Sequence, residues 1–401
     1  MLIANPKATR QTYPDSLKSV MNIEKAGESR QWLSRWARLN AGATPLYSLP
    51  DLAYELGVAQ FLVKDESVRS ELGSFKALGA PIALVRLILR TFPEQRFDPR
   101  GLLDGQYAAA LADFTVISAT DGNHGRGLAA AAQSIGCRCV IVIHAHVSVE
   151  REEAIAAYGA QIIRIEGNYD ESVEEAAALA TRNDWIVVSD TSYEGYEVIP
   201  RDVMQGYGTL AAEIIEAAAP VFTHVFLQGG VGGLAAGVAS YFWEHYGKER
   251  PIFVMVEPQQ ADCLYQSALA GKASRATGSV DSVMAGLACG ETSALAWRFL
   301  EPCVDFFMTI SDDEAVAAMR RLAAGSERDI PLVAGESGVA GLAGLVRLVR
   351  EGRAADMGLD ASSRVMIIST EGATAPGVYA ELTGESAASV LARQAAWVLK
   401  D

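Results

Sequence analysis

Short apolar runs alternate with amphipathic stretches between residues 115 and 188. The apolar runs predict strands at 115–118, 139–143, 161–165 and 185–188, and the amphipathic stretches predict helices at 123–135, 150–158 and 171–181. Gly136 and Gly159 follow the first two helices and are expected to end them. Strands and helices that take turns at this spacing predict a parallel sheet with right-handed crossovers.

A second group of apolar runs flanks this block and predicts strands at 221–227, 252–256 and 365–369. We therefore expect an α/β protein with two open parallel-sheet domains. The small domain would comprise residues 86–195, and the large domain would comprise residues 1–85 and 196–401. Because ligands of such folds bind beyond the carboxyl ends of the strands, the active site is expected between the two domains.

The segment 217–243 contains no Asp, Glu, Lys or Arg, and its length alone would allow a membrane span. A glycine-rich loop at 229–233 interrupts it in the middle. We interpret the segment as a buried strand, a loop and a helix, and we predict no membrane association.

The same loop, Gly-Gly-Val-Gly-Gly, indicates a phosphate site. It joins a predicted strand to a predicted helix, so its backbone N–H groups and the helix N-terminus can face an anion. Its spacing departs from the dinucleotide fingerprint, and no Lys-Ser or Lys-Thr pair follows it as in a P-loop. A tight glycine turn without a ligand is the alternative.

Lys76 lies in the segment 73–80, Gly-Ser-Phe-Lys-Ala-Leu-Gly-Ala, among small and apolar residues. A lysine in apolar surroundings has a lowered pKa and can form a Schiff base with an aldehyde such as pyridoxal phosphate. From this octapeptide alone, a surface lysine whose stem covers apolar side chains is the alternative.

A third loop, Ser-Ala-Thr-Asp-Gly-Asn-His-Gly at 118–125, follows a predicted strand and enters an alanine-rich helix. Lys76, this loop and the glycine loop, in that order, resemble the fold-type II pyridoxal phosphate enzymes, the family of threonine dehydratase, serine racemase and the tryptophan synthase β chain. Within that family the chain resembles the diaminopropionate ammonia-lyases. The matching blocks lie at 62–67, 119–127, 190–207, 284–291 and 369–372.

The resemblance implies pyridoxal 5'-phosphate as the cofactor. Lys76 would bind its aldehyde, and Asn123 would form a hydrogen bond to the ring hydroxyl. The hydroxyl of Ser369 or Thr370 would meet the pyridine nitrogen, and a neutral partner there favours elimination over transamination. The phosphate would be held by the backbone of Gly229, Gly230, Val231, Gly232 and Gly233.

Substrate contacts are implied for the loop at 120–124 and for one distant acid. The substrate carboxylate would be held by Thr120 and by the N–H groups of Asp121, Gly122, Asn123 and His124. The Asp121 carboxylate would bind a second ammonium group and act as a base on the Cα face opposite Lys76, so that both enantiomers could react. Asp190 would bind the β-amino group or support that base. Asp121 would also serve as a helix N-cap, which is compatible with catalysis.

The resemblance implies β-elimination of ammonia from 2,3-diaminopropionate, in the D or L form, to give pyruvate and a second ammonia. A serine, threonine or β-hydroxy amino acid dehydratase is the alternative among enzymes. An amino-acid-binding protein with this fold and no catalysis is the alternative from another class, although the intact Lys76 argues against it. Fold analogy implies a homodimer.

Composition is that of an ordinary globular enzyme, with 401 residues, 50% of them hydrophobic and 21% charged. The net charge of −15 argues against nucleic acid as a partner, because phosphate backbones would repel the protein. The first residues contain no apolar leader segment, so we expect a cytoplasmic protein.

Five cysteines fit a reducing compartment. Cys263 and Cys289 could meet near the active site, but free thiols are expected. Two further cysteines and two histidines cluster in the sequence, at Cys137, Cys139, His144 and His146. Their spacing matches no standard zinc pattern, so no metal site is predicted.

Overall fold

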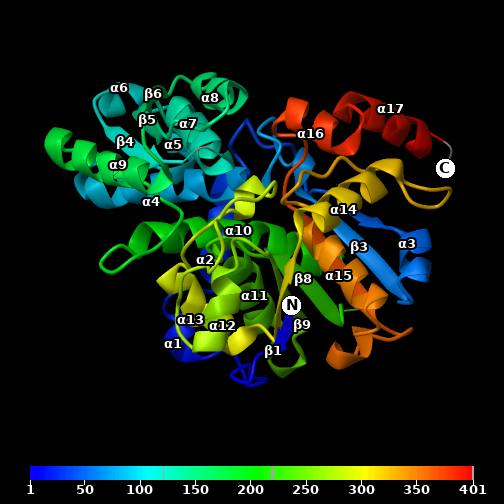
Figure 1. Cartoon of the computed structure of the whole chain (residues 1–401). Coiled ribbons are helices and arrows are strands. Elements are labelled where there is room, and N and C mark those ends of the chain that lie inside the picture. Colours follow the sequence, from blue (N-terminus) through cyan, green and yellow to red (C-terminus); the bar gives the residue numbers. More distant parts are fainter. Residues whose placement is uncertain (121, 218–220, 400–401) are drawn as a thin grey trace.

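The computed structural model describes residues 1–120, 122–217 and 221–399, which form two β-sheets flanked by helices (Figure 1). The larger sheet contains β1 (Leu2–Ala4), β2 (Leu46–Ser48), β3 (Gln60–Asp65), β8 (His224–Gln228), β9 (Ile252–Pro258), β10 (Phe306–Ile310) and β11 (Arg364–Ser369). The smaller sheet contains β4 (Thr115–Ala119), β5 (Arg138–Ile143), β6 (Gln161–Arg164) and β7 (Ile186–Val187).

Most strand pairs in both sheets are parallel. The larger sheet has the order β1-β10-β9-β8-β11-β3-β2, and its two edge strands, β1 and β2, are the antiparallel ones. The smaller sheet has the order β6-β5-β4-β7 and is parallel throughout. The predicted α/β fold with two open parallel-rich sheets is therefore confirmed.

Helices cover both sheets. Those between residues 99 and 183 are α5 (Pro99–Leu103), α6 (Ala108–Leu111), α7 (Asn123–Ile135), α8 (Val149–Ala156) and α9 (Tyr169–Asn183). The others are α1 (Asp15–Lys18), α2 (Ile23–Leu33), α3 (Pro50–Glu55), α4 (Ala80–Thr91), α10 (Val198–Ala217), α11 (Gly233–Tyr246), α12 (Cys263–Ala270), α13 (Ala294–Cys303), α14 (Asp312–Ala324), α15 (Ala340–Arg350), α16 (Pro376–Thr383) and α17 (Ala387–Val398).

One apolar core joins the two sheets. It contains Leu227 of β8, Ile141 of β5 and the apolar side chains of α4, α7, α10 and α11. Helix α4 lies between α7 and α10, which explains why Ile82, Leu84 and Val85 are all fully buried. The opposite face of the larger sheet packs against α3, α14 and α15, and that of the smaller sheet packs against α9.

The predicted elements of the smaller sheet are close to those observed. Helix α7 has the predicted bounds, and Gly136 ends it with a φ of 88°. The strands of the smaller sheet all lie within residues 86–195 and those of the larger sheet lie outside that range, while the domain boundaries themselves stay a prediction. Strands β1, β2, β3 and β10 were not predicted.

The uncharged segment at 217–243 includes β8 and most of α11, as its interpretation as a strand, a loop and a helix requires. Across the described ranges, no helix has the length and apolar character needed to cross a membrane.

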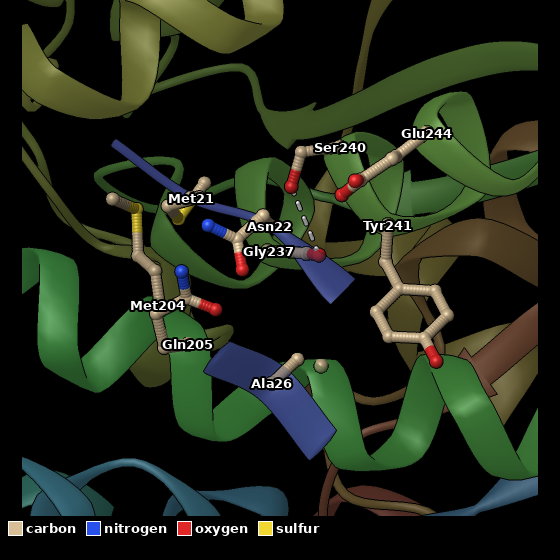
Figure 2. Close-up of a pocket in the computed structure, with 10 residues that line it drawn as sticks. Met21, Asn22, Ala26, Met204, Gln205, Gly237, Ser240, Tyr241 and Glu244 are labelled. Carbon is tan, nitrogen blue, oxygen red and sulfur yellow. Dashed lines mark hydrogen bonds between the residues drawn. The ribbon is translucent and has the colours of Figure 1, made fainter. Parts of the chain in front are cut away.

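A small cavity lies between α2, α10 and α11 (Figure 2). Its volume of about 10 Å³ is close to that of a single water site. Gln205 lines it, and the Nε2 of this buried amide has no hydrogen-bond partner within the described part of the chain. None of the predicted site residues lines this cavity, so it is separate from the candidate active site.

Candidate active site

Lys76 lies in a short 3₁₀ helix, η2 (Phe75–Leu78), that is held against the end of β11. The Phe75 N–H donates to the carbonyl of Thr370 at 3.0 Å, and Ser74 forms a β-bridge with Glu371. The Lys76 side chain is 21% exposed, and its Nζ lies 5.9 Å from the centre of the Tyr207 ring. The predicted apolar surroundings of this lysine are therefore present.

The Nζ of Lys76 forms an ion pair with Oδ2 of Asp190. Burial lowers the pKa of Lys76, but the Asp190 carboxylate outweighs burial, so the pKa lies above its usual value. The lowered pKa predicted for this residue is therefore wrong in this state of the protein. The prediction considered only the apolar neighbours, whereas a carboxylate from a distant segment decides the sign.

Asp190 lies between Lys76 and His124. Burial raises the pKa of Asp190, but the positive charge of Lys76, helped by His124, holds it well below its usual range. The His124 Nε2 donates to the carbonyl of Val188 at 2.9 Å, and its Nδ1 lies 3.8 Å from Oδ2 of Asp190. The buried His124 ring therefore links the end of β7 to this carboxylate, a side-chain contact that the sequence did not reveal.

The loop after β4 brings the predicted substrate-binding residues to the N-terminus of α7. Thr120 Oγ1 accepts a hydrogen bond of 3.4 Å from the Gly122 N–H, and Asn123 is the first residue of the helix. Asp121 lies outside the described residues, and the N-cap of α7 is Gly122, so the predicted N-cap role of Asp121 is wrong. The N–H groups at the start of α7 and its dipole together favour an anion at this position.

The glycine loop connects β8 to α11, as predicted. Gly232 has a φ of 101°, and a Cβ there would lie 2.8 Å from Cδ1 of Leu300. A Cβ on Gly230 would lie 3.1 Å from both Sγ of Cys289 and the carbonyl oxygen of Gly286. Side chains at Gly230 and Gly232 would therefore crowd their neighbours, and the backbone of the loop forms a cradle at the start of a helix.

Ser369 is the last residue of β11, an interior strand of the larger sheet, and Thr370 follows it. Thr370 Oγ1 accepts a hydrogen bond of 3.1 Å from Nε2 of Gln228. Ser369 is 1% exposed, and its Oγ has no hydrogen-bond partner among the residues that the structure describes. A buried hydroxyl of this kind lacks a partner that a ligand atom can supply. Together with the glycine cradle and Lys76, it fits pyridoxal phosphate.

Two buried acids near this end of β11 were missed as site residues. Glu371 accepts a hydrogen bond from Nδ2 of Asn123, and Glu336 is close enough for the charge of Glu371 to affect its pKa. Glu371 belongs to the Ser-Thr-Glu-Gly motif at 369–372. A charged residue directly after a buried strand was the available signal, because buried charges require specific partners.

Neither thiol at the glycine loop is in a disulfide. Cys263 donates to the carbonyl of Gly230 at 3.4 Å, and Cys289 lies against the same glycine, but none of the five cysteines is disulfide-bonded. The region that the structure describes contains no group of three or more His, Cys, Asp and Glu side chains arranged to hold a metal ion.

This arrangement of a part-buried lysine, a glycine cradle and a helix N-terminus between two parallel-rich sheets defines a pyridoxal-phosphate dependent enzyme, and the model of the family "Pyridoxal-phosphate dependent enzyme" matches residues 37–371. The chain is 37% identical over 356 residues to diaminopropionate ammonia-lyase from Salmonella typhimurium. The matched region covers 86% of this chain and 88% of that protein. The chain belongs to the diaminopropionate ammonia-lyase family, and its cofactor is pyridoxal phosphate.

Two crystal structures of the Escherichia coli diaminopropionate ammonia-lyase are similar to this structure. The complex with an aminoacrylate–PLP azomethine reaction intermediate has a TM-score of 0.85, and the complex with D-serine has a TM-score of 0.87. Both are 36% identical to this chain, and each comparison covers 96% of both chains.

Proposed function

We propose that the protein eliminates ammonia from 2,3-diaminopropionate and releases pyruvate and a second ammonia. The ion pair between Lys76 and Asp190 carries this proposal. Asp190 already holds one ammonium group, that of the lysine that binds the cofactor. A substrate β-ammonium group at the same position would meet the same carboxylate, whereas the hydroxyl of serine would leave that charge uncompensated.

The chain's other residues have separate roles in this proposal. Thr120 and the N–H groups at the start of α7 bind the substrate carboxylate, and the backbone of the glycine loop at 229–233 binds the phosphate. Asn123 donates to the ring hydroxyl. The Ser369 hydroxyl meets the pyridine nitrogen, supported by its burial and its lack of a partner among the described residues.

The cofactor, when bound, stabilises negative charge at the substrate Cα. The Lys76 amine takes the Cα proton of one enantiomer, the electron pair forms the Cα–Cβ double bond, and the β-ammonium group leaves as ammonia. Asp190 orients that leaving group through the whole step. Water then hydrolyses the released enamine to pyruvate and ammonia.

Asp121 is proposed as the base for the D enantiomer. Its position in the sequence, between Thr120 and Gly122, supports this role, because in the proposed arrangement this loop meets the substrate on the side opposite Lys76. The expected homodimer also stays a proposal, which light scattering of the purified protein tests.

A serine or threonine dehydratase is the second candidate, favoured by the complex of the E. coli relative with D-serine. The test is the release of pyruvate, 2-oxobutyrate and ammonia from D- and L-diaminopropionate, D- and L-serine and threonine, with Lys76→Ala as the control. We expect the highest kcat/KM on a diaminopropionate enantiomer, with two ammonia per pyruvate. A higher kcat/KM on serine or threonine would establish the dehydratase. Substrate binding without product would indicate a binding protein.

A further inference from the structure

Asn123 and Glu371 connect the two sheets at the candidate active site. Asn123 begins α7, which follows β4 of the smaller sheet, and Glu371 follows β11 of the larger sheet. The Asn123 Nδ2 donates to Oε2 of Glu371, and the Ser337 N–H donates to Oε1 of Glu371 at 3.3 Å. Glu371 is 4% exposed, so both carboxylate oxygens accept hydrogen bonds away from solvent.

A second acid and one arginine complete this group. Glu336 is 6% exposed, and its Oε1 lies 3.8 Å from Nη2 of Arg151 on α8. Burial and the charge of Glu371 raise the pKa of Glu336 to about 7. Burial also raises the pKa of Glu371, while the hydrogen bonds from Ser337 and Asn123 oppose that rise. Glu371 accepts hydrogen bonds from two N–H groups, and such bonds favour the charged form of a carboxyl group, so we assign the negative charge of the pair to Glu371.

The chemistry of the carboxylate determines how the Asn123 amide is turned. An ionised carboxylate only accepts hydrogen bonds, so the Nδ2 of Asn123 must face Glu371 and the Oδ1 must face away. An amide turned by 180° would place its oxygen against the carboxylate. Fixing one N–H of Nδ2 on Glu371 also fixes the direction of the second N–H.

We propose that Glu371 is a positioning residue that orients the Asn123 amide so that its second N–H meets the ring hydroxyl of pyridoxal phosphate. Glu336 and Arg151 support it by keeping the negative charge on Glu371. This inference rests on the proposed role of Asn123, and no substrate enters it. The hydrogen bond to Glu371 explains why the Asn123 amide has one fixed orientation. Without such a partner, an amide at a helix N-terminus could turn either way.

The test is a double-mutant cycle of Glu371→Gln and Asn123→Ala, read by titrating the apoenzyme with pyridoxal phosphate and by the absorption maximum of the bound cofactor. Glutamine keeps the shape and an acceptor for Ser337 but turns a donor toward Asn123. We expect the Kd for pyridoxal phosphate to rise about tenfold and the absorption maximum to move. In the Asn123→Ala background, Glu371→Gln should add less than about twofold.

The same Kd increase in both backgrounds, or no increase in the wild-type background, would overturn the proposal. Asp329→Asn is the matched control, because Asp329 is a buried acid that accepts two backbone N–H bonds, from Asp51 and Leu52, away from Asn123. It should leave the Kd unchanged. If Glu371→Gln does not fold, Glu371→Asp replaces it. Aspartate keeps the charge, but its shorter side chain moves the carboxylate away from Asn123. The Kd for pyridoxal phosphate should again rise in the wild-type background and change little in the Asn123→Ala background.

The readouts separate this proposal from the proposed function. Cofactor affinity and absorption involve no amino-acid substrate, so an enzyme inactive on diaminopropionate would defeat the proposed function and leave this result standing. If the wild-type enzyme is active on diaminopropionate but Glu371→Gln leaves the Kd for pyridoxal phosphate unchanged, the proposed function stands and the role of Glu371 is refuted.

Discussion

Lys76 and Asp190 form a part-buried ion pair across 114 residues of sequence. The pair joins the lysine loop before α4 to the loop that follows β7. Each partner shifts the other: the pKa of Lys76 is raised and that of Asp190 is lowered, despite burial, which would act in the opposite direction on both. The lysine is therefore held in its charged form until its partner is removed or neutralised.

Asp190→Asn should shift cofactor uptake by the apoenzyme to lower pH. Only the neutral amine attacks the aldehyde, and the Asp190 carboxylate raises the pKa of Lys76, so its removal lets burial lower that pKa. The measurement is the rate of pyridoxal phosphate incorporation by absorbance across a pH series. Asp113→Asn, at an exposed ion pair with Arg138, is the control. An unchanged pH profile would contradict the electrostatic role of Asp190.

Asp190→Asn should also lower kcat/KM on diaminopropionate by about 10²-fold or more, and lower it less on serine. The reason is that the β-ammonium group loses its counter-charge, whereas a hydroxyl never required one. Steady-state kinetics on both substrates decide the point. Equal losses on the two substrates would mean that Asp190 acts only through Lys76.

Lys76→Ala should abolish turnover by several orders of magnitude, because it removes the group that binds the cofactor and one Cα base together. Borohydride reduction of the wild-type holoenzyme should attach the cofactor to Lys76, which peptide mapping by mass spectrometry detects. An adduct on another lysine would refute the assignment.

Gly232→Ala should weaken cofactor binding and lower the Tm. The residue has a φ of 101°, and its Cβ would approach Leu300 at 2.8 Å, so the loop must shift away from the phosphate position. Gly233→Ala is the matched control, because its Cβ would meet its nearest neighbour, Cγ of Met204, at 3.7 Å. Apoenzyme titration and thermal melting of both variants test the prediction. The same Kd and the same Tm in the two variants would refute the steric explanation.

Asp121→Asn keeps the size and shape of the side chain and removes only its charge, so it should fold and bind the cofactor normally. We expect activity on D-diaminopropionate to fall by about 10²-fold or more, the range for a missing general base, and activity on the L form to fall less because Lys76 still serves it. Kinetics on both enantiomers measure this. Equal small losses on the two enantiomers would contradict the role of Asp121 as the base.

The sequence predicted the elements whose signals are local. Helix α7 and the glycine loop could be placed because glycines, small residues and apolar runs occur in fixed order. Strand β3 was harder to recognise, because its buried end carries Lys64 and Asp65, and a buried Lys64 requires Glu213 from α10, at 2.7 Å, as a partner. A charged residue can be assigned to a buried strand only when the partner that neutralises its charge is known.

The same limit explains the errors at the site. Lys76 was recognised from its neighbours in sequence, but the direction of its pKa shift depends on Asp190. Glu371 stands in a recognised motif, yet its role follows from contact with Asn123, 248 residues away. Sequence reasoning finds residue types at expected places, whereas electrostatics depends on pairs that only the fold brings together.

The apolar core shared by the two sheets limits how the site can open. Pulling the sheets apart would expose that core to water at about 25 cal/mol per Å². The contacts beside the cofactor are polar: Arg151 with Glu336, Asn123 with Glu371, and Glu150 with the Gly377 N–H. We therefore expect any opening of the site to separate these polar contacts before it exposes the shared core.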